Sequence, residues 1–506
     1  MERRSHCQKT QGVIFNKLAE KTFFEGVDSG VVVDSTSIGA QGVQTESNNL
    51  PCDDVHFKVA HSPINIQFLE IWLSKYKSHD ANILLNGFKH GFRLNYSGPR
   101  QARVSKNLKS VKQQPELAQQ KIQKEVDAGR VAGPFTVSPF KNLQISPIGL
   151  VPKKSPGEYR LIHHLSYPEG LSVNEFIDPK ICSVKYTEFD EAIRIIQDLG
   201  RNCYLFKMDI KSAFRLLPIH PDDFELLGFS CMEKIYFDNC LPFGCSISPS
   251  LFEKFSTFLE FCIKSKMNSG RLIHYLDDFL GGEKGYESCK SLMLLFETIM
   301  NKLGVPLADE KTEGPLKVIV FLGLELDSDK MEIRIPIVKI DEVIQKIEFI
   351  LSKNSVTLRE MQSLIGSLNF CCRAIVVGRP FCRRLINSTC GVKRPFHHVR
   401  LNKGIKLDLE MWLRFFRNCN GISVFHDRFW LSNDDEQLYT DSSGGIGFGI
   451  WFNGHWCHAR WPVAWHSNGL TRDITVLELF PLLQLFVFGA GSYEIRRYGF
   501  TVTTRP

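Results

Sequence analysis

The sequence predicts an α+β protein in which apolar strands alternate with helices around a small set of carboxylates. Residues 203–210 form an apolar run, typical of a buried strand, that carries one acid, Asp209, near its end. Residues 272–282 place Asp277 and Asp278 between two short apolar runs, which predicts a β-hairpin with both acids at or beside its tip. Residues 286–303 then show a helical pattern that stops at Gly304.

Composition indicates an ordinary globular protein. The 506 residues are enough for about three domains, and 43% of them are hydrophobic and 23% charged. We find no signal peptide and no apolar run of membrane-spanning length, so no membrane partner is expected. The fifteen cysteines include no Cys-x-x-Cys pair and often lie in apolar runs, which predicts reduced thiols in an intracellular protein, cytoplasmic, nuclear or both.

The first 130 residues predict two different regions. Residues 1–60 are polar and weakly periodic, which predicts a poorly ordered extension. Residues 61–130 are helical and basic, with a helix expected over 115–128. Between Arg93 and Arg130, basic side chains exceed acidic ones by six. This excess fits a polyanion partner and fits a solvated surface equally well, and both interpretations stay open.

Residues 145–162 predict a hairpin with cations near its tip, namely Lys153, Lys154 and Arg160. Such cations suit a triphosphate, although any exposed hairpin can carry them. Farther on, Thr187 is expected to open a helix through a capping box, and Gly200 to close it. Residues 318–326 predict one further strand.

The three acids Asp209, Asp277 and Asp278 come from two segments 68 positions apart. Gathered on one face of a sheet, they would offer the oxygen ligands that Mg²⁺ prefers. Two such ions about 4 Å apart serve in-line displacement at phosphorus. The alternative is a solvated acidic turn, because Asp is a common turn residue.

The order of these motifs resembles that of reverse transcriptases. The resemblance rests on Asp209 with Ala213-Phe214, Leu241-Pro242-Phe243-Gly244 with Ser248-Pro249, Tyr275-Leu276-Asp277-Asp278, Lys311 and Phe321-Leu322-Gly323. It covers roughly residues 60–485. It implies a right-hand polymerase fold, with fingers and palm over 131–335 and thumb and helical connection over 336–430. Residues 159–168, 357–366 and 378–381 are similar, more narrowly, to the DIRS/Ngaro group of tyrosine-recombinase retrotransposons.

The resemblance also implies roles for individual residues. Asp209, Asp277 and Asp278 would hold two Mg²⁺ ions, with Mn²⁺ as an alternative metal. Lys153, Lys154 and Arg160 would grip the incoming triphosphate, and Lys311 would protonate the leaving pyrophosphate. Phe214 would exclude a 2′-hydroxyl, and Phe243 and Gly244 would line the nucleotide pocket. Phe321, Leu322 and Gly323 would grip the primer.

Two positions depart from the family pattern. His163-His164 replaces a more familiar acidic position, so no role is inferred for it. Phe243 stands where retroviral enzymes have Gln, although Phe is usual in other retroelements. The basic cluster of Arg373, Arg379, Arg383 and Arg384 is expected to contact the template–primer backbone, with binding that falls as salt rises.

Residues 431–488 look like the first half of an RNase H fold, followed by a tail over 489–506. Asp441 and Glu478 would be two of its metal-binding acids. A complete site needs a further Asp on a later strand, which the sequence lacks, so we expect a partial domain without RNase H activity.

The function expected from the sequence is therefore RNA-directed DNA polymerase activity, using an RNA template, a DNA primer and dNTPs. The alternatives are a catalytically silent nucleic-acid-binding remnant of a retroelement and a cellular polymerase or repair enzyme with the same palm. Intact palm acids argue against the first, and Phe214 argues against a ribonucleotide substrate.

Overall fold

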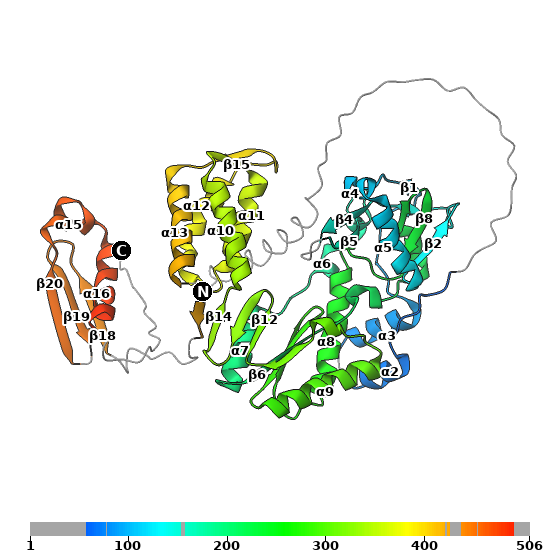
Figure 1. The fold of residues 1–506 in the computed structure, drawn as a ribbon, viewed down its shortest axis with the longest axis horizontal. Helices are drawn as coiled ribbons and strands as arrows, with labels where there is room; N and C mark the ends of the chain where they lie inside the picture. The colour runs from blue at the N-terminus through cyan, green and yellow to red at the C-terminus, as the bar shows by residue number, and fades with distance from the viewer. Residues whose placement is uncertain are drawn as a thin grey trace, which may run out of the picture. The chain divides into compact units, whose positions relative to one another are not determined.

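The computed structural model describes residues 57–76, 78–152, 157–419, 422–425, 437–452 and 454–489. The chain divides into two compact units, Met1–Ser423 and Val424–Pro506, and Figure 1 shows their helices and strands. The expected extension over residues 1–60 and the tail over 489–506 lie almost wholly outside the described residues. Among the described residues, no helix has the length and apolar character needed to cross a membrane.

The palm is a four-stranded antiparallel sheet in the order β11-β6-β10-β9. Its strands are β6 (Tyr204–Asp209), β9 (Arg271–Tyr275), β10 (Asp278–Glu283) and β11 (Glu313–Leu316). Helices α8 (Ser248–Lys264) and α9 (Tyr286–Leu303) share a core with Phe206, Met208 and Phe279 on one face. On the opposite face, helix α7 (Phe189–Leu199) brings Leu199 against Gly282. The predicted strand, hairpin and helix are confirmed.

The glycines after the acids lie within β10, where they make room for neighbouring side chains. A Cβ at Gly281 would lie 2.3 Å from the Phe206 ring, and one at Gly282 would lie 2.9 Å from Leu205. Contacts this short would force the strand β6 away from β10. The pair therefore permits the close packing that sets Asp278 opposite Asp209.

The N-terminal helices belong to the palm core. The first part of the region predicted to be helical, residues 61–130, forms two helices, α2 (Ile66–Leu73) and α3 (Asp80–His90). The Asn65 side chain caps α2, and the Asn65 amide donates to the Leu303 carbonyl at 2.8 Å. Leu69 and Trp72 are buried in the same core as Met300 of α9. These helices therefore support the sheet that carries the acids.

The fingers are built on a five-stranded sheet in the order β1-β3-β7-β8-β2 and on a separate hairpin, β4-β5. The strands are β1 (Arg103–Val104), β2 (Val131–Phe135), β3 (Gln144–Ile145), β4 (Ile148–Pro152), β5 (Tyr159–His163), β7 (Gly228–Cys231) and β8 (Lys234–Asp238). The associated helices are α4 (Lys109–Gln113), α5 (Pro115–Asp127), η1 (Val173–Phe176), α6 (Pro179–Cys182), η2 (Ala213–Leu216) and η3 (Pro221–Leu226). The expected hairpin over residues 145–162 and the helix over 115–128 are thus confirmed.

After the palm, the chain forms a small sheet and a helical bundle, in the region predicted to be thumb and connection. The sheet has the order β12-β13-β14-β17, with β12 (Val318–Phe321), β13 (Leu324–Asp327), β14 (Glu332–Arg334) and β17 (Ile422–Val424). The helices are η4 (Asp309–Lys311), α10 (Ile337–Leu351), α11 (Leu358–Cys371), η5 (Val376–Gly378), α12 (Pro380–Ser388) and α13 (Lys403–Cys419). Strands β15 (Ser355–Thr357) and β16 (His398–Arg400) pair beside them. Thr357 and Glu360 form a capping box at the start of α11.

Two local predictions are wrong. Residues 318–326 are not one strand, because Leu322 and Gly323 adopt φ of 47° and 82° and turn the chain back as β13. The Thr187 capping box does not form. Helix α7 begins after Glu188, and the N-cap makes no side-chain hydrogen bond. Acidic side chains in the first turn, Asp190 and Glu191, favour the helix N-terminus through its dipole instead.

The second unit contains a three-stranded antiparallel sheet in the order β18-β19-β20. Its elements are β18 (Leu438–Ser442), β19 (Gly447–Phe452), β20 (His455–Arg460), α15 (Val463–Ser467), η6 (Leu470–Arg472) and α16 (Ile474–Gly489). The Ser442 hydroxyl donates to the Leu477 carbonyl at 2.9 Å, which ties α16 to β18. The domain boundaries drawn from the sequence stay predictions.

Candidate active site

The three palm carboxylates meet where β6 and β10 pair. Asp278 is the register partner of Asp209, and the Ile210 amide donates to the Asp277 carbonyl at 3.0 Å. The β9-β10 turn is tight, with Leu276 in the left-handed region at φ 54°. This turn lets two neighbouring acids approach one partner, although adjacent strand residues normally point to opposite faces.

The carboxylates repel one another in a partly buried setting. Burial and the charge of Asp209 raise the pKa of Asp277. Burial, then Asp277 and Asp209, raise the pKa of Asp278 to about 7. Asp209 is 4% exposed, and its Oδ1 has no hydrogen-bond donor among the described residues. The repulsion among these carboxylates is unfavourable, and a bound cation would reduce it.

Lys311 lies beside this cluster. Its Nζ donates to Asp209 Oδ2 at 2.9 Å, while its side chain stays about half exposed. Burial alone would lower the pKa of Lys311, but the hydrogen bond to Asp209 and the charges of the three acids raise it. The ammonium therefore keeps its proton next to the acids.

The donor set fits a hard divalent cation. Three carboxylates supply oxygen ligands, and Asp209 Oδ1 is buried and unbonded in the described part of the chain. In this conformation, however, no group of three or more His, Cys, Asp or Glu among the described residues meets the geometry of a complete metal site. Ligand oxygens from substrate phosphates normally complete a Mg²⁺ shell, so an incomplete protein set is expected for that ion.

A buried ion pair supports the acidic hairpin from β9. His274 is 5% exposed, bonds Glu260 through Nδ1, and has Nε2 3.3 Å from Glu253 Oε1. Burial lowers the pKa of His274, but the two glutamates raise it further, to about 9. The imidazolium therefore links β9 to α8 immediately before Asp277.

We expect this ion pair to make stability depend on alkaline pH. Because the folded pKa of His274 is raised, its contribution is complete below about 6.5 and is lost as pH rises through about 9. The contribution is at most about 3 kcal/mol. Between pH 7 and 10, the Tm of the native chain should fall more steeply than that of His274→Gln. His398→Gln, at an exposed position, serves as control, and parallel slopes for native and His274→Gln proteins would contradict this assignment.

The predicted nucleotide-binding residues Arg160, Phe243 and Phe214 contact one another in a row, which we call the nucleotide stack although its two aromatic rings are tilted by 45°. The Arg160 guanidinium lies 5.0 Å from the Phe243 ring centroid, and Phe243 lies 5.3 Å from Phe214. Phe214 in turn packs edge-on against Phe252 of α8 at 5.4 Å. The structure therefore brings Arg160, Phe214 and Phe243 together. The charge of Arg160 also reaches Asp277, where it offsets a small part of the rise in the pKa of that carboxyl caused by burial and Asp209. Lys153 and Lys154 lie outside the described residues.

Asn174 is a site residue to which sequence reasoning gave no role. Its Nδ2 donates to the Gly244 carbonyl at 2.8 Å, and its Oδ1 accepts from the Ser246 amide at 2.9 Å. Gly244 has φ 114°, a backbone conformation that favours glycine. Asn174 thus pins the loop that carries Phe243. Its place in a polar turn after residues 159–168 was the available signal, but its partner lies 70 positions away.

The segment predicted to grip the primer is the β12-β13 turn. Phe321 is buried, whereas Leu322 and Gly323 form the turn itself. Lys207 of β6 donates to the Val320 carbonyl at 3.2 Å, which joins this turn to the palm strand that carries Asp209.

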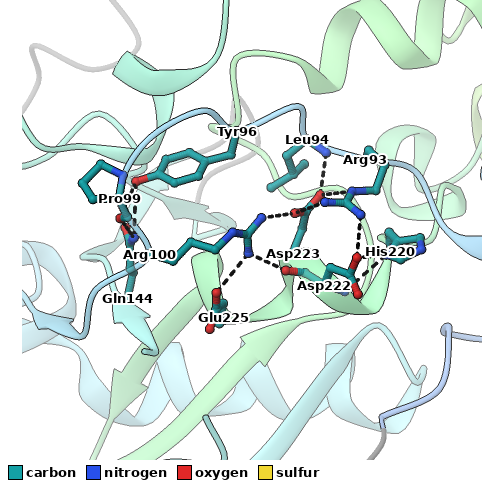
Figure 2. A network of polar contacts seen from close by, with 10 residues as sticks. All are labelled: Arg93, Leu94, Tyr96, Pro99, Arg100, Gln144, His220, Asp222, Asp223 and Glu225. Atoms are coloured by element: carbon teal, nitrogen blue, oxygen red, sulfur yellow. Dashed lines mark hydrogen bonds and ion pairs between the residues drawn. The ribbon is translucent and has the colours of Figure 1, made fainter. Parts of the chain in front are cut away.

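The basic stretch from Arg93 to Arg130 is partly neutralised within the fold. Figure 2 shows Arg93 and Arg100 converging on Asp223, which is fully buried. Arg93 Nε donates to Asp223 Oδ2 at 3.0 Å, and Arg100 Nη2 donates to Oδ1 at 2.7 Å. Arg130 pairs with Glu125 at 2.8 Å. These three arginines are structural, so the excess charge available to a polyanion is smaller than the sequence suggests.

The predicted thumb arginines lie at the α11–α12 junction and along α12. Arg373, Arg379, Arg383 and Arg384 are exposed. Arg373 also lies over the Phe189 ring at 5.7 Å, and Arg384 reaches Asp408 at 3.4 Å. Exposed cations on adjacent turns remain suited to phosphate contacts.

In the second unit, Asp441 of β18 and Glu478 of α16 come together. Burial and the charge of Asp441 raise the pKa of Glu478. The structure therefore brings the two predicted RNase H acids within electrostatic reach of one another.

Comparison with known proteins identifies the class. Residues 151–326 match the family model "Reverse transcriptase (RNA-dependent DNA polymerase)". This segment includes the three palm acids, Lys311 and the nucleotide-site residues Arg160, Phe214 and Phe243. A solved foamy viral protease-reverse transcriptase in complex with double-stranded DNA has a TM-score of 0.51 and 17% identity, covering 78% of this chain and 68% of that one. The chain therefore has a right-hand polymerase fold.

Curated relatives share part of this chain. A putative enzymatic polyprotein of Cassava vein mosaic virus is 29% identical over 33% of this chain and 24% of its own length. The Gag-Pro-Pol polyprotein of Mason-Pfizer monkey virus is 24% identical over 58% of this chain and 15% of its own length. The chain thus matches a quarter or less of either relative. Residues 151–326 form a reverse transcriptase domain of the retroviral and retroelement type.

Proposed function

We propose that this chain is an RNA-directed DNA polymerase that extends a DNA primer with dNTPs on an RNA template. The observation that carries the proposal is the trio Asp209, Asp277 and Asp278 at the paired ends of β6 and β10, inside the segment that matches the family. The stack of Arg160, Phe243 and Phe214 supplies a cation and aromatic surfaces for a nucleotide.

In the proposed reaction, the primer 3′-hydroxyl loses its proton to solvent and its oxygen forms a bond to the α-phosphorus of the dNTP. The bond from that phosphorus to the pyrophosphate oxygen breaks, and pyrophosphate leaves. Asp209, Asp277 and Asp278 would hold divalent cations, Mg²⁺ or Mn²⁺, which when bound neutralise phosphate charge and favour the attacking alkoxide. Arg160 would orient the triphosphate by fork-like donation. Lys311, which retains its proton beside Asp209, would donate that proton from Nζ to the departing pyrophosphate.

The finer assignments are part of the same proposal. The motifs at residues 159–168 and 357–366 support a tyrosine-recombinase retrotransposon of the DIRS/Ngaro type. The exposed arginines of α12 support backbone contact with a template–primer duplex. Cysteine thiols without disulfides in the described ranges support an intracellular location, cytoplasmic or nuclear. The interaction of Asp441 with Glu478 supports an RNase H-like domain over residues 431–488.

The test is primer extension on an RNA template with Mg²⁺, comparing the native protein with Asp277→Asn. The native protein should incorporate dNTPs in template order, and the variant should not rise above background. Equal background from both proteins would overturn the proposal. A DNA template of the same sequence, run in the same assay, shows whether the protein prefers RNA as template. An RNA–DNA hybrid with labelled RNA shows whether the protein also cleaves the RNA strand.

A further inference from the structure

A second charged cluster lies buried between the elements that carry the nucleotide stack. It consists of Arg215, Asp238 and His163, which are 7%, 5% and 4% exposed. They come from three elements, since Arg215 is in η2, Asp238 ends β8, and His163 ends the hairpin strand β5. The proposed reaction uses none of them directly.

All three guanidinium nitrogens of Arg215 donate hydrogen bonds to other residues of the protein. Nη1 donates to Asp238 Oδ1 at 2.7 Å and to the Cys240 carbonyl at 2.9 Å. Nε donates to Glu125 Oε2 at 3.0 Å, and Nη2 donates to the Arg130 carbonyl at 3.0 Å. The side chain therefore joins η2 to β8, to the segment after β8, and to the end of α5.

His163 completes the link from the other side. Its Nδ1 lies 2.9 Å from Asp238 Oδ2, and its Nε2 lies 3.2 Å from the Gly228 carbonyl. A carboxylate and a carbonyl can only accept, so each ring nitrogen that makes one of these bonds does so as a donor. The His163 amide also donates to the Phe243 carbonyl at 3.1 Å. One residue thus bonds both Asp238 and the backbone of the nucleotide pocket.

Each member of this cluster lies within five positions of a residue of the nucleotide stack along the chain. Arg215 directly follows Phe214, and His163 stands three positions after Arg160 on the same strand. Asp238 and the Cys240 carbonyl anchor the segment that leads to Phe243. The three stack residues therefore sit on three elements whose mutual placement depends on one set of buried hydrogen bonds.

A gain in folding stability does not by itself explain why these three charged side chains are buried together. Removing charges from water is costly, and apolar side chains of similar volume are often as stabilising as a buried ion pair. A fully bonded network does fix one geometry, because its hydrogen bonds are directional and strong in a low dielectric. Burial opposes the charge of Asp238, yet Arg215 and His163 hold its pKa below the ordinary value, so the carboxylate stays ionised.

We propose that Arg215, Asp238 and His163 act together as positioning residues for the incoming nucleotide, holding Arg160, Phe214 and Phe243 in register. This inference rests on the proposed function and assigns a role to the His163 position for which the sequence gave none. None of the three residues is assigned a contact with the nucleotide.

The test compares His163→Leu, His163→Asn, Arg215→Lys and Asp238→Asn with the native protein. Leu removes both imidazole donors, whereas Asn keeps a donor near the Nδ1 position. Asp223→Asn is the matched control, because Asp223 is also a fully buried carboxylate held by two arginines, in the network of Figure 2. Each protein is measured for Tm, for kcat and KM of one dNTP, and for preference for dNTP over the corresponding rNTP.

We expect His163→Leu, Arg215→Lys and Asp238→Asn to raise the KM for dNTP by about tenfold and to lower dNTP-over-rNTP preference by about tenfold, because small misplacements of binding groups are costly. The kcat at saturating dNTP should change less than the KM. His163→Asn should lie between His163→Leu and native. Asp223→Asn should lower Tm without changing the KM for dNTP or the preference for dNTP over rNTP. If the cluster variants lower Tm but leave KM and preference as in the native protein, the cluster is only structural and the proposal is overturned.

A readout without catalysis separates this proposal from the polymerase assignment. Amide hydrogen exchange in peptides spanning residues 238–246 should accelerate in His163→Leu and Asp238→Asn, but not in Asp223→Asn. A native protein that incorporates no dNTP defeats the proposed function while this exchange pattern still tests the positioning role. Unchanged exchange in that segment would overturn the positioning role itself.

Discussion

Replacing Asp277 with Asn is expected to lower the rate of dNTP incorporation by at least about a thousandfold, because groups that stabilise developing charge at the reacting centre make the largest single contributions to catalysis. The substitution is nearly isosteric and keeps the backbone bond between Ile210 and Asp277. It removes one of the three negative charges that would hold the divalent cations. The loss should appear in kcat rather than in the KM for dNTP.

The same substitution is expected to stabilise the metal-free protein. The pKa of Asp278 is raised to about 7 by burial, Asp277 and Asp209. A raised carboxyl pKa means that this group opposes folding increasingly as pH rises from about 4 through 7. With Asn at position 277, one repulsion disappears and the pKa of Asp278 falls. The variant should therefore gain about 1 kcal/mol at pH 8, and the gain should vanish near pH 4.

Primer extension and thermal unfolding in chelator test both halves of this prediction. Asp309→Asn, an exposed acid on the turn that carries Lys311, is the matched control and should leave rate and Tm unchanged. Substantial incorporation by Asp277→Asn would remove this carboxylate from the proposed chemistry. A lower Tm for the variant at pH 8 would show that the acids are not in mutual repulsion.

Sequence reasoning found the parts of the site that depend on the pattern of side chains within short segments of the chain. An apolar strand ending in Asp209 and a hairpin around Asp277 and Asp278 can be inferred from side-chain alternation, because their order along the chain fixes their geometry. The Tyr286–Leu303 helix was predicted with its boundaries for the same reason. Arg160, Phe214 and Phe243 were found through family motifs, and the structure brings them into contact.

The parts that were missed depend on partners far away in the chain. Asp238 meets His163 across 75 positions, and Asp223 meets Arg93 across 130 positions, so neither pairing is visible in a local window. The sequence therefore could not show that part of the positive charge of residues 93–130 is used in ion pairs within the fold. The turn at Leu322 was not predicted, because its apolar side chain continues the pattern of a strand. In the structure, its positive φ marks the point where the chain reverses.

Phe214→Val is expected to lower the preference for dNTP over rNTP by about 100-fold, while incorporation of dNTP changes little. The Phe214 ring is half-buried and is held between Phe243 and Phe252, at 5.3 and 5.4 Å, so it cannot swing away from a 2′-hydroxyl without breaking both contacts. Valine keeps an apolar surface but removes most of the ring, which opens space for the hydroxyl. Phe214→Tyr keeps the ring and should retain the preference. Competition between dCTP and CTP on one primed RNA template measures it, and equal preference in native and Phe214→Val proteins would exclude Phe214 as the gate.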